Sequence, residues 1–590
     1  MKKKYCIVTT ADERTWPDNK PILFLGEWCK RFSRKKNWNK LDSETLKYHW
    51  DDRDKLREDY SYLQEQHEVL LRDLSKQLNK IHKKNYSIRY WRILIGPWLG
   101  YFTQVLFDRW SMLNLALKEF DIDTCYVLNN NVSVVPADMK DFENLFIDDK
   151  WNEVIFGQLI HNSSRNKMNI VSVNIHSSDS SLTNEQLFYS RSKDKLNTLL
   201  SKLSGYVTRK NDYFFISSYI PLLTQFKLQL QLNQFPSLWY SPEIDYSGVD
   251  LHEREWVMDN SDSADEFIKI ACQFIPNHIP IAYLEGYNLL NQYVKKIKWP
   301  KNPKAIFTCN AYLANELFKV WTAEKTENSV PLIIGQHGGH FGVTGFAFFE
   351  EHQINISDKF LSWGWSSSNS KIKPFANIKL LNDGLKYNPN GDALMIGLSM
   401  PRYSYHLYAA PISSQWLSYF SDQCNFMKTL PHSLRKRILV RLAKKDYGWE
   451  QQLRWENEFS KIKIDLGHKS IKKLLENSRL CISTYNATSY LETLSWNMPT
   501  IIFWDEENWE LNQDAIPYFN LLLDAGIFHR TPQSAAKKVI EIWDDIDSWW
   551  YSNQVQNARS QFCERYSKVS DNSVNEFGCF LKKISEKITI

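Results

Sequence analysis

The sequence predicts an α/β fold made of two doubly wound domains. From residue 124 onward, short β-rich runs alternate with helical segments, which is the pattern of a parallel sheet covered by helices. The alternation starts again after a polar segment at residues 366–390. With 590 residues, the chain has room for two large domains.

The first half begins with a strand-like run at residues 4–10, followed by a polar loop. Residues 46–81 carry apolar positions three and four apart among many Lys and Glu, which predicts exposed amphipathic helices. Residues 87–120 are helical but more apolar, and we expect Gly96-Pro97 to break or kink that helix because proline lacks a backbone donor. We expect the rest of this half to complete one elaborated α/β domain, with strands at 125–128, 213–218, 305–309 and 331–336.

The second half repeats the pattern more cleanly. We expect strands at 393–398, 437–441, 461–465, 480–483 and 500–504, with helices at 413–427 and from residues 470 and 489. A sheet of this kind binds ligands outside the carboxyl ends of its strands. The predicted domains are therefore 1–385 and 386–570, and a helical tail at 571–590 is expected to pack back on the first domain.

Composition excludes several classes of protein. A formal net charge of +5 on so long a chain is too small to predict nucleic-acid binding, although weak attraction to an anionic membrane stays open. No run approaches 18 uncharged apolar residues and no secretory signal is evident, so we expect a cytoplasmic protein, soluble or peripheral at the inner membrane. The nine scattered cysteines contain no C-x-x-C pair and predict reduced thiols.

A glycine-rich turn after an apolar strand is the sharpest functional signal. The strand ends in Gln336-His337, and Gly338 and Gly339 follow. Glycines let the backbone approach a ligand, and a strand end is where a ligand site should open. His337 at that place is expected to bind a phosphate or sugar carboxylate, or to act as a general acid or base; a structural histidine beside a turn is the alternative.

Three carboxylates, two of them adjacent, and a histidine occur together in the segment 350–358. Glu350 and Glu351 precede His352, and Asp358 ends the segment. The spacing matches no specific metal motif, so no metal site is predicted, and the carboxylates are expected to be polar ligands or scaffold.

The second half contains a strand-to-helix turn rich in hydroxyl groups. Orphan N–H groups at a helix start, together with the helix dipole, favour a phosphate. Any single hydroxyl here could instead be only a helix cap. Glu492 in the first turn of the helix suits a ribose diol. The phosphate candidates are Ser483, Thr484, Asn486, Thr488 and Ser489.

Other charged residues are weaker candidates. Arg441 at a strand end and Lys444 could neutralise a departing phosphate, although a solvated charge run is nearly as consistent with them. Asp12 and Glu13 after the first strand, and Asp108, could each supply a catalytic base or nucleophile on the acceptor side.

These motifs resemble a known family over nearly the whole chain. Residues 9–16, 90–98, 335–339 and 486–492 look like those of transferases encoded in bacterial O-antigen biosynthesis regions. More distantly, the two turns resemble those of GT-B glycosyltransferases that use CMP-activated sugars, such as Kdo and sialic-acid transferases, and of CDP-glycerol polymerases. This resemblance implies two Rossmann-like domains facing each other across a cleft, a nucleotide held mainly by the second, and no essential metal or other cofactor. It would place His337 near the donor phosphate or carboxylate.

The leading hypothesis is transfer of a CMP-activated acidic 2-keto sugar to a lipid-linked or lipopolysaccharide acceptor at the inner face of the cytoplasmic membrane. The expected partners are a nucleotide-sugar donor, a glycolipid or polysaccharide acceptor and the membrane surface. An NDP-sugar or CDP-glycerol donor is the nearest alternative. A noncatalytic scaffold of polysaccharide assembly is the alternative from another class.

Overall fold

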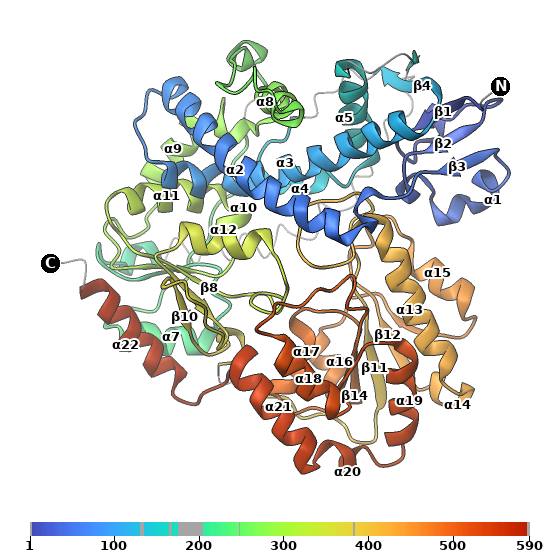
Figure 1. Cartoon of the computed structure of the whole chain (residues 1–590). Coiled ribbons are helices and arrows are strands. Elements are labelled where there is room, and N and C mark those ends of the chain that lie inside the picture. Colours follow the sequence, from blue (N-terminus) through green and yellow to red (C-terminus); the bar gives the residue numbers. More distant parts are fainter. Residues whose placement is uncertain are drawn as a thin grey trace.

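Three parallel β-sheets form the framework of the protein. The computed structural model describes residues 3–129, 135–163, 168–174, 204–246, 248–381 and 384–586. Every strand pair in the three sheets is parallel. The predicted α/β fold with parallel sheets is therefore confirmed. In Figure 1 the first sheet lies at the upper right, the second at the left and the third at the bottom.

The first sheet has the strand order β3-β2-β1-β4-β5. Its strands are β1 (Tyr5–Val8), β2 (Ile22–Phe24), β3 (Ser43–Thr45), β4 (Ile122–Asn129) and β5 (Asn169–Asn174). The accompanying helices are α1 (Lys35–Trp38), α2 (Arg53–Ile81), α3 (Ile88–Glu119), α4 (Met139–Leu145) and α5 (Asp149–Asn162). The strand order reverses between β1 and β4, which creates a topological switch point at their carboxyl ends.

The second sheet has the order β10-β9-β8-β7-β6, with no reversal. Its strands are β6 (Phe214–Phe215), β7 (Ile306–Thr308), β8 (Leu332–Gly335), β9 (Lys359–Ser362) and β10 (Ile372–Pro374). The helices in this part are α7 (Leu222–Gln231), α8 (Glu266–His278), α9 (Tyr287–Lys296), α10 (Ala311–Ala314), α11 (Glu316–Glu327) and α12 (Phe348–Ile356). The segment 1–385 thus holds two sheets where the sequence predicted one elaborated domain, because alternation of strands and helices reveals strands but not which of them pair.

The third sheet has the order β13-β12-β11-β14-β15-β16. Its strands are β11 (Asp392–Ile396), β12 (Ile438–Arg441), β13 (Lys463–Asp465), β14 (Ser478–Ser483), β15 (Thr500–Phe503) and β16 (Phe528–His529). The helices are α13 (Trp416–Thr429), α14 (His432–Arg435), α15 (Gln451–Glu458), α16 (Ile471–Glu476), α17 (Thr488–Ser495), α18 (Ile516–Asp524), α19 (Pro532–Ile542), α20 (Ile546–Trp550) and α21 (Asn553–Tyr566). The order reverses between β11 and β14, so the loop after β14 lies at a second switch point.

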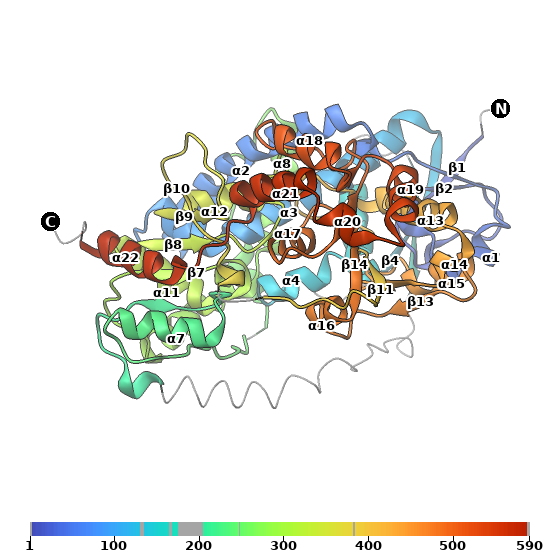
Figure 2. The same ribbon diagram turned by 90° about the horizontal axis from the view of Figure 1, so that it is seen from below.

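The last helix, α22 (Ser573–Glu586), crosses from the third sheet to the second (Figures 1 and 2). The ring of Phe577 lies 4.9 Å from that of Phe307 and 5.5 Å from that of Phe375, measured between centroids. Tyr213 and Ser585 share a hydrogen bond of 2.9 Å between their hydroxyl oxygens. Residues 587–590 of the predicted tail lie outside the described residues.

Helix α3 does not break at Gly96-Pro97. It runs without interruption and contains Pro97, contrary to the expected break, and it packs against α2 and α11. Both Trp91 and Trp98 are fully buried. Burial of this apolar helix outweighs the roughly 3 kcal/mol that an internal proline costs.

Two further findings bear on the sequence predictions. Among the described residues the nine cysteines are all free thiols, and Cys579 is the exposed one. No helix in the described part of the chain combines the length and the apolar character that a bilayer crossing requires.

Candidate functional site

Polar side chains follow the adjacent strands β6, β7 and β8 at one edge of the second sheet. His337 comes just after β8, and its ring centroid lies 6.1 Å from that of Tyr219 and 6.3 Å from that of Tyr312. Its Nδ1 atom is buried without a hydrogen-bond partner, and so is Oδ1 of Asn310, which follows β7. Burial, reinforced by the charge of Lys379, lowers the pKa of His337 to about 4. The imidazole is therefore neutral at neutral pH and offers hydrogen bonds rather than a positive charge.

Gln336 shapes the turn instead of facing a ligand. Its Oε1 accepts hydrogen bonds from the backbone N–H of Trp363 at 3.0 Å and from Nε1 of Trp365 at 2.8 Å. Its Nε2 donates to the carbonyl of Gly338 at 2.8 Å. Both ends of the amide are therefore engaged. Gln336 supports the backbone of the turn and has no free group for the ligand contact that the sequence predicts.

The two turns predicted from the sequence meet each other. The backbone N–H of Gly339, after β8, donates to Oγ1 of Thr488 at the start of α17, with a distance of 3.1 Å. A Cβ atom on Gly339 would lie 2.5 Å from the carbonyl oxygen of Ala487 and 2.8 Å from Cα of Thr488. Only glycine therefore allows this approach of the two backbones.

The start of α17 has no side-chain cap. Its N-cap residue is Ala487, which excludes the simple capping role that Thr488 or Ser489 could have had. Nδ2 of Asn486 is buried without a partner. Thr488 accepts the bond from Gly339, so its own hydroxyl proton stays available.

Three of the predicted hydroxyls are already occupied as donors. Ser483 donates to the carbonyl of Tyr485 at 3.4 Å, Thr484 to that of Ile396 at 2.8 Å, and Ser489 to the hydroxyl of Tyr485 at 3.1 Å. A phosphate oxygen accepts hydrogen bonds and needs donors. These three hydroxyls hold the loop after β14 in shape.

Glu492 forms an ion pair between the second and third sheets. Nζ of Lys379, in the 3-10 helix Ile378–Leu380, lies 2.7 Å from Oε1 of Glu492. The same lysine lowers the pKa of His337 by its charge. The pair thus connects the segment after the second sheet with α17 and lies within electrostatic reach of His337.

The two predicted cations have different surroundings. Arg441 ends β12, beside β11, and its Nε is buried without a hydrogen-bond partner. Lys444 is exposed and lines a separate cavity of about 570 Å³ together with Asp446, Glu450 and His468. A half-buried guanidinium with an unpaired Nε is a better site for an anion than an exposed lysine.

The carboxylates predicted on the acceptor side are engaged elsewhere. Asp12 pairs with Arg14, with Oδ2 2.6 Å from Nη2. Glu13 is exposed, 3.9 Å from Arg34.

Asp108 lies buried within α3. It accepts bonds from Tyr48 at 2.7 Å and Arg109 at 2.7 Å and contacts His49 at 3.1 Å. Burial would raise the pKa of Asp108, but these partners together lower it to about 2. Asp108 therefore links α3 to the segment before α2.

The structure adds residues that the sequence did not single out. Asn310 follows a strand just as His337 does, so the pattern of a polar residue after an apolar strand also indicates Asn310. Lys379 lies in the polar segment 366–390, where no such pattern indicates a functional residue. Glu143 on α4 is half-buried, and burial raises its pKa. Its charge acts on Tyr312, beside His337, and on Tyr447, after β12.

Glu153 lies at the switch point of the first sheet. It accepts hydrogen bonds from Thr10 at 2.7 Å and Thr9 at 3.2 Å, just after β1. Burial raises its pKa to about 7. Among the described residues no group of three or more His, Cys, Asp or Glu is placed to hold a metal ion.

Comparison with known proteins gives one decisive match. A family described as "LIC12162 family transferase" matches residues 5–580. The chain belongs to the LIC12162 family of transferases. The matched region begins with β1 and ends within α22, so it includes all three sheets. No curated protein matches this LIC12162 family member in sequence.

Three solved structures show a remote likeness to this family member. The wall teichoic acid polymerase TagF is 12% identical, with a TM-score of 0.33, over 67% of this chain and 95% of that one. A UDP-N-acetylglucosamine 2-epimerase is 9% identical, with a TM-score of 0.31, over 62% and 94%. WaaG, a glycosyltransferase involved in lipopolysaccharide biosynthesis, is 10% identical, with a TM-score of 0.26, over 50% and 95%.

Proposed function

We propose that this transferase is a glycosyltransferase that moves a CMP-activated acidic 2-keto sugar, of Kdo or nonulosonate type, to a lipid-linked or lipopolysaccharide acceptor. The observation that carries the proposal is the hydrogen bond between Gly339 and Thr488. It joins a strand end of one parallel sheet to a helix start at the switch point of another. Such an arrangement brings the glycine-rich turn that contains His337 next to the uncapped N–H groups of α17, so that one anionic ligand can contact both.

The proposed donor site binds the nucleotide phosphate at the start of α17. Its donors are the uncapped N–H groups of the helix, the hydroxyl of Thr488 and Nδ2 of Asn486. The guanidinium of Arg441 supplies the positive charge that a departing nucleotide phosphate requires. Glu492, held by Lys379, is suited to accept hydrogen bonds from the ribose hydroxyls.

His337 is proposed to bind the sugar part of the donor. A neutral imidazole donates one hydrogen bond and accepts another. Binding of an anionic sugar carboxylate beside it would favour the protonated form and raise its pKa above the value of about 4 in the free protein. CMP as the nucleotide rests on the sequence resemblance of the two turns.

Glu143 is the proposed base for the acceptor hydroxyl. Its pKa is raised by burial, which makes the carboxylate a stronger base. It lies within electrostatic reach of Tyr312 on the His337 side and of Lys445 in the loop after β12. Removal of the acceptor proton would create the nucleophile while Arg441 and α17 stabilise the phosphate that leaves.

Contact with a membrane is proposed through α7 and its neighbours. Leu222, Leu223 and Leu230 on α7 are exposed, as is Phe235 shortly after it. Apolar side chains on one helix suit the interfacial region of a bilayer. Co-sedimentation with vesicles of phosphatidylethanolamine and phosphatidylglycerol should fall when Leu223 and Phe235 are both replaced by Ser, and unchanged sedimentation would refute the contact.

Turnover with defined donors tests the proposed reaction. CMP should raise the melting temperature more than UDP or GDP do, because ligands that bind only the folded state stabilise it. CMP-Kdo with a cell-envelope extract should release CMP, and the release should be lost in His337→Gln. If the protein prefers a UDP-sugar or CDP-glycerol, the proposed CMP-activated donor is wrong and that compound takes its place. Binding without any turnover would favour a noncatalytic scaffold.

A further inference from the structure

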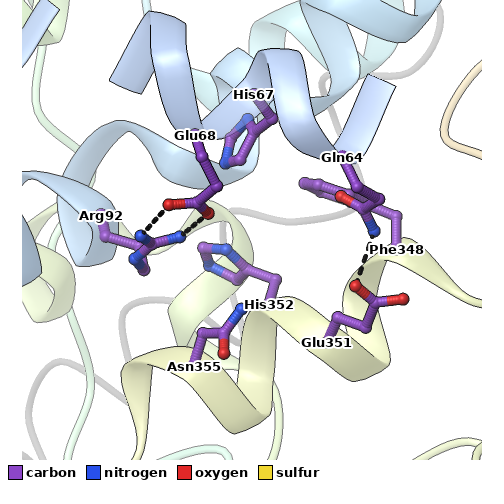
Figure 3. A pocket seen from close by; sticks show the side chains of 8 residues that line it. All are labelled: Gln64, His67, Glu68, Arg92, Phe348, Glu351, His352 and Asn355. Carbon is purple, nitrogen blue, oxygen red and sulfur yellow. Dashed lines mark hydrogen bonds and ion pairs between the residues drawn. The ribbon is translucent and has the colours of Figure 1, made fainter. Parts of the chain in front are cut away.

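A polar pocket lies between α2, α3 and α12, apart from the residues proposed to bind the donor. Its volume is about 350 Å³, within the range of about 300 to 1,000 Å³ of typical ligand sites. Figure 3 shows its lining side chains, with the imidazole of His352 lying between the Glu68–Arg92 pair and Asn355, and that of His67 on the α2 side. The lining residues are Gln64, His67, Glu68, Arg92, Phe348, Glu351, His352 and Asn355.

Helix geometry builds this pocket. Gln64, His67 and Glu68 are three and four residues apart on α2, and the four α12 residues follow the same spacing. Residues at such intervals share one helix face, so two facing helices present their side chains to one space. The pocket is therefore made by packed helices rather than by loops.

Two buried histidines in the pocket have nitrogen atoms without partners. His67 is 4% exposed and lacks a partner at Nδ1, and His352 is 3% exposed and lacks partners at both ring nitrogens. Burial, followed by the charge of Arg92, lowers the pKa of His67 to about 4, and burial lowers that of His352 well below its usual value. Each unsatisfied buried polar group costs about 1–3 kcal/mol, so these nitrogens need an explanation.

The charges around the pocket disfavour an ionic ligand. The guanidinium of Arg92 is held by both carboxylate oxygens of Glu68. Glu351 adds a second carboxyl group, which accepts bonds from Tyr60 and Gln64. An anion would therefore meet no uncompensated positive charge, and the described residues contain no cluster placed to hold a metal ion.

Hydroxyl groups match what the imidazoles lack. A neutral imidazole has one N–H donor and one acceptor nitrogen, and a hydroxyl both donates and accepts. Carboxylate and amide groups at the rim accept and donate further bonds, and the ring of Phe348 supplies an apolar surface. We propose that this pocket, which we call the α2–α12 pocket, binds an uncharged, hydroxyl-rich ligand, namely a sugar residue.

The α2–α12 pocket is also connected to the proposed donor site. Helix α12 follows the glycine-rich turn, and the ring of Tyr312 lies 5.9 Å from His352 and 6.3 Å from His337. A sugar residue held there would belong to the acceptor glycan; this further assignment rests on the proposed function, whereas sugar binding itself does not.

Ligand-observed NMR with no nucleotide present tests the proposal. Saturation transfer from the full-length protein to methyl glycosides of glucose, galactose, N-acetylglucosamine and rhamnose is measured for wild type, His67→Phe and His352→Phe. At least one glycoside should bind the wild type, and both variants should weaken it about tenfold or more, which corresponds to about 1.4 kcal/mol. Phenylalanine removes the unpaired nitrogens without leaving a partner unsatisfied, so both variants should keep or raise the melting temperature.

The control is His278→Phe, which replaces another buried histidine outside the pocket, with Nδ1 also unpaired. It should bind the glycoside like the wild type. Absence of binding to any glycoside, or equal binding in all variants, would mean that the pocket holds water only and would overturn the proposal. So would stabilisation by sulfate or Zn²⁺ that depends on His67 and His352. Thermal shifts with CMP are measured in the same variants. Normal CMP binding is expected in each, so a loss of sugar binding can be told apart from a failure of the proposed donor site.

Discussion

The backbone N–H of Gly339 and Oγ1 of Thr488 lie 3.1 Å apart, although the two residues follow strands of different sheets. This single bond brings the glycine-rich turn after β8 onto the start of α17. The ion pair between Lys379 and Glu492 lies across the same junction. Any change that separates the two backbones should therefore act first on ligand binding there.

Replacing Gly339 with Ala should weaken CMP binding about tenfold or more, which equals about 1.4 kcal/mol. The added Cβ would lie 2.5 Å from the carbonyl oxygen of Ala487, so the two turns must move apart. Gly345→Ala in the same loop is the matched control, because its Cβ would meet its nearest atom at 3.5 Å, an ordinary contact. Titration of CMP by calorimetry measures both, and equal affinities would contradict the assigned junction.

Replacing Arg441 with Gln should abolish most CMP binding while the melting temperature stays constant or rises. Its buried Nε has no partner in the free protein, so the folded state loses no hydrogen bond there. Lys444→Gln removes the exposed cation nearby and should leave CMP affinity within about twofold, as expected for a solvated charge. The reverse ranking of the two variants would move the phosphate site to the cavity that Lys444 lines.

Replacing Glu143 with Gln should lower kcat by a factor of about 10² to 10⁴, the usual contribution of a general base, and leave CMP affinity unchanged. In the wild type the half-buried carboxyl has a raised pKa and can accept the proton of the acceptor hydroxyl. The amide of the Gln variant cannot accept this proton. Glu13→Gln removes an exposed carboxylate that the sequence also suggested and should leave turnover unchanged. If Glu13→Gln loses turnover and Glu143→Gln does not, the catalytic base is Glu13, in the loop after β1, and not Glu143.

Replacing Glu350 with Gln should stabilise the protein increasingly as the pH rises. Burial raises the pKa of Glu350 from 4.5 to about 7, so in this interval the folded state holds a proton that the unfolded state has lost. The contribution of this carboxyl to stability is therefore full below pH 4.5, falls as the pH approaches 7 and is constant above it. The variant keeps the acceptor for the backbone N–H of Gly342 and lacks this dependence.

Melting curves between pH 4.5 and 8 measure this effect. The difference between variant and wild type should grow over the interval to about 3 kcal/mol, since a shift of one pKa unit corresponds to about 1.4 kcal/mol. A difference that is independent of pH would show that Glu350 is not protonated in the folded protein.

Replacing Phe577 with Ala should destabilise the protein by about 3–5 kcal/mol, the usual cost of removing a buried aromatic ring. The side chain is fully buried between Phe307 and Phe375. Phe580→Ala, in the same helix but only partly buried, should cost clearly less. Because α22 carries no residue of the proposed donor site, CMP affinity well below the melting temperature should stay unchanged in both variants.

Local patterns predicted much of this architecture. The strands β1 and β8 lie within runs that the sequence predicts as strands, and β11 and β14 overlap such runs but begin one or two residues earlier. The His337 and Thr488 turns could be found in the same way, since a buried strand followed by glycine or hydroxyl residues is a pattern of adjacent positions. Pro97 was misinterpreted because a local rule ignores the burial of α3 on several sides.

By itself, the sequence determined the parallel α/β character, the two turns and the chemical types available in them. Only the tertiary structure decided that residues 1–385 form two sheets, that Gly339 approaches Thr488, and that Lys379 pairs with Glu492. It also decided that Asp108 and Gln336 serve the framework, because Asp108 binds Tyr48 and Gln336 binds Trp363, which are distant in the chain. The physical reason is that a strand or a cap depends on neighbours a few residues away, whereas hydrogen-bond satisfaction and pKa depend on what is buried beside a group in space.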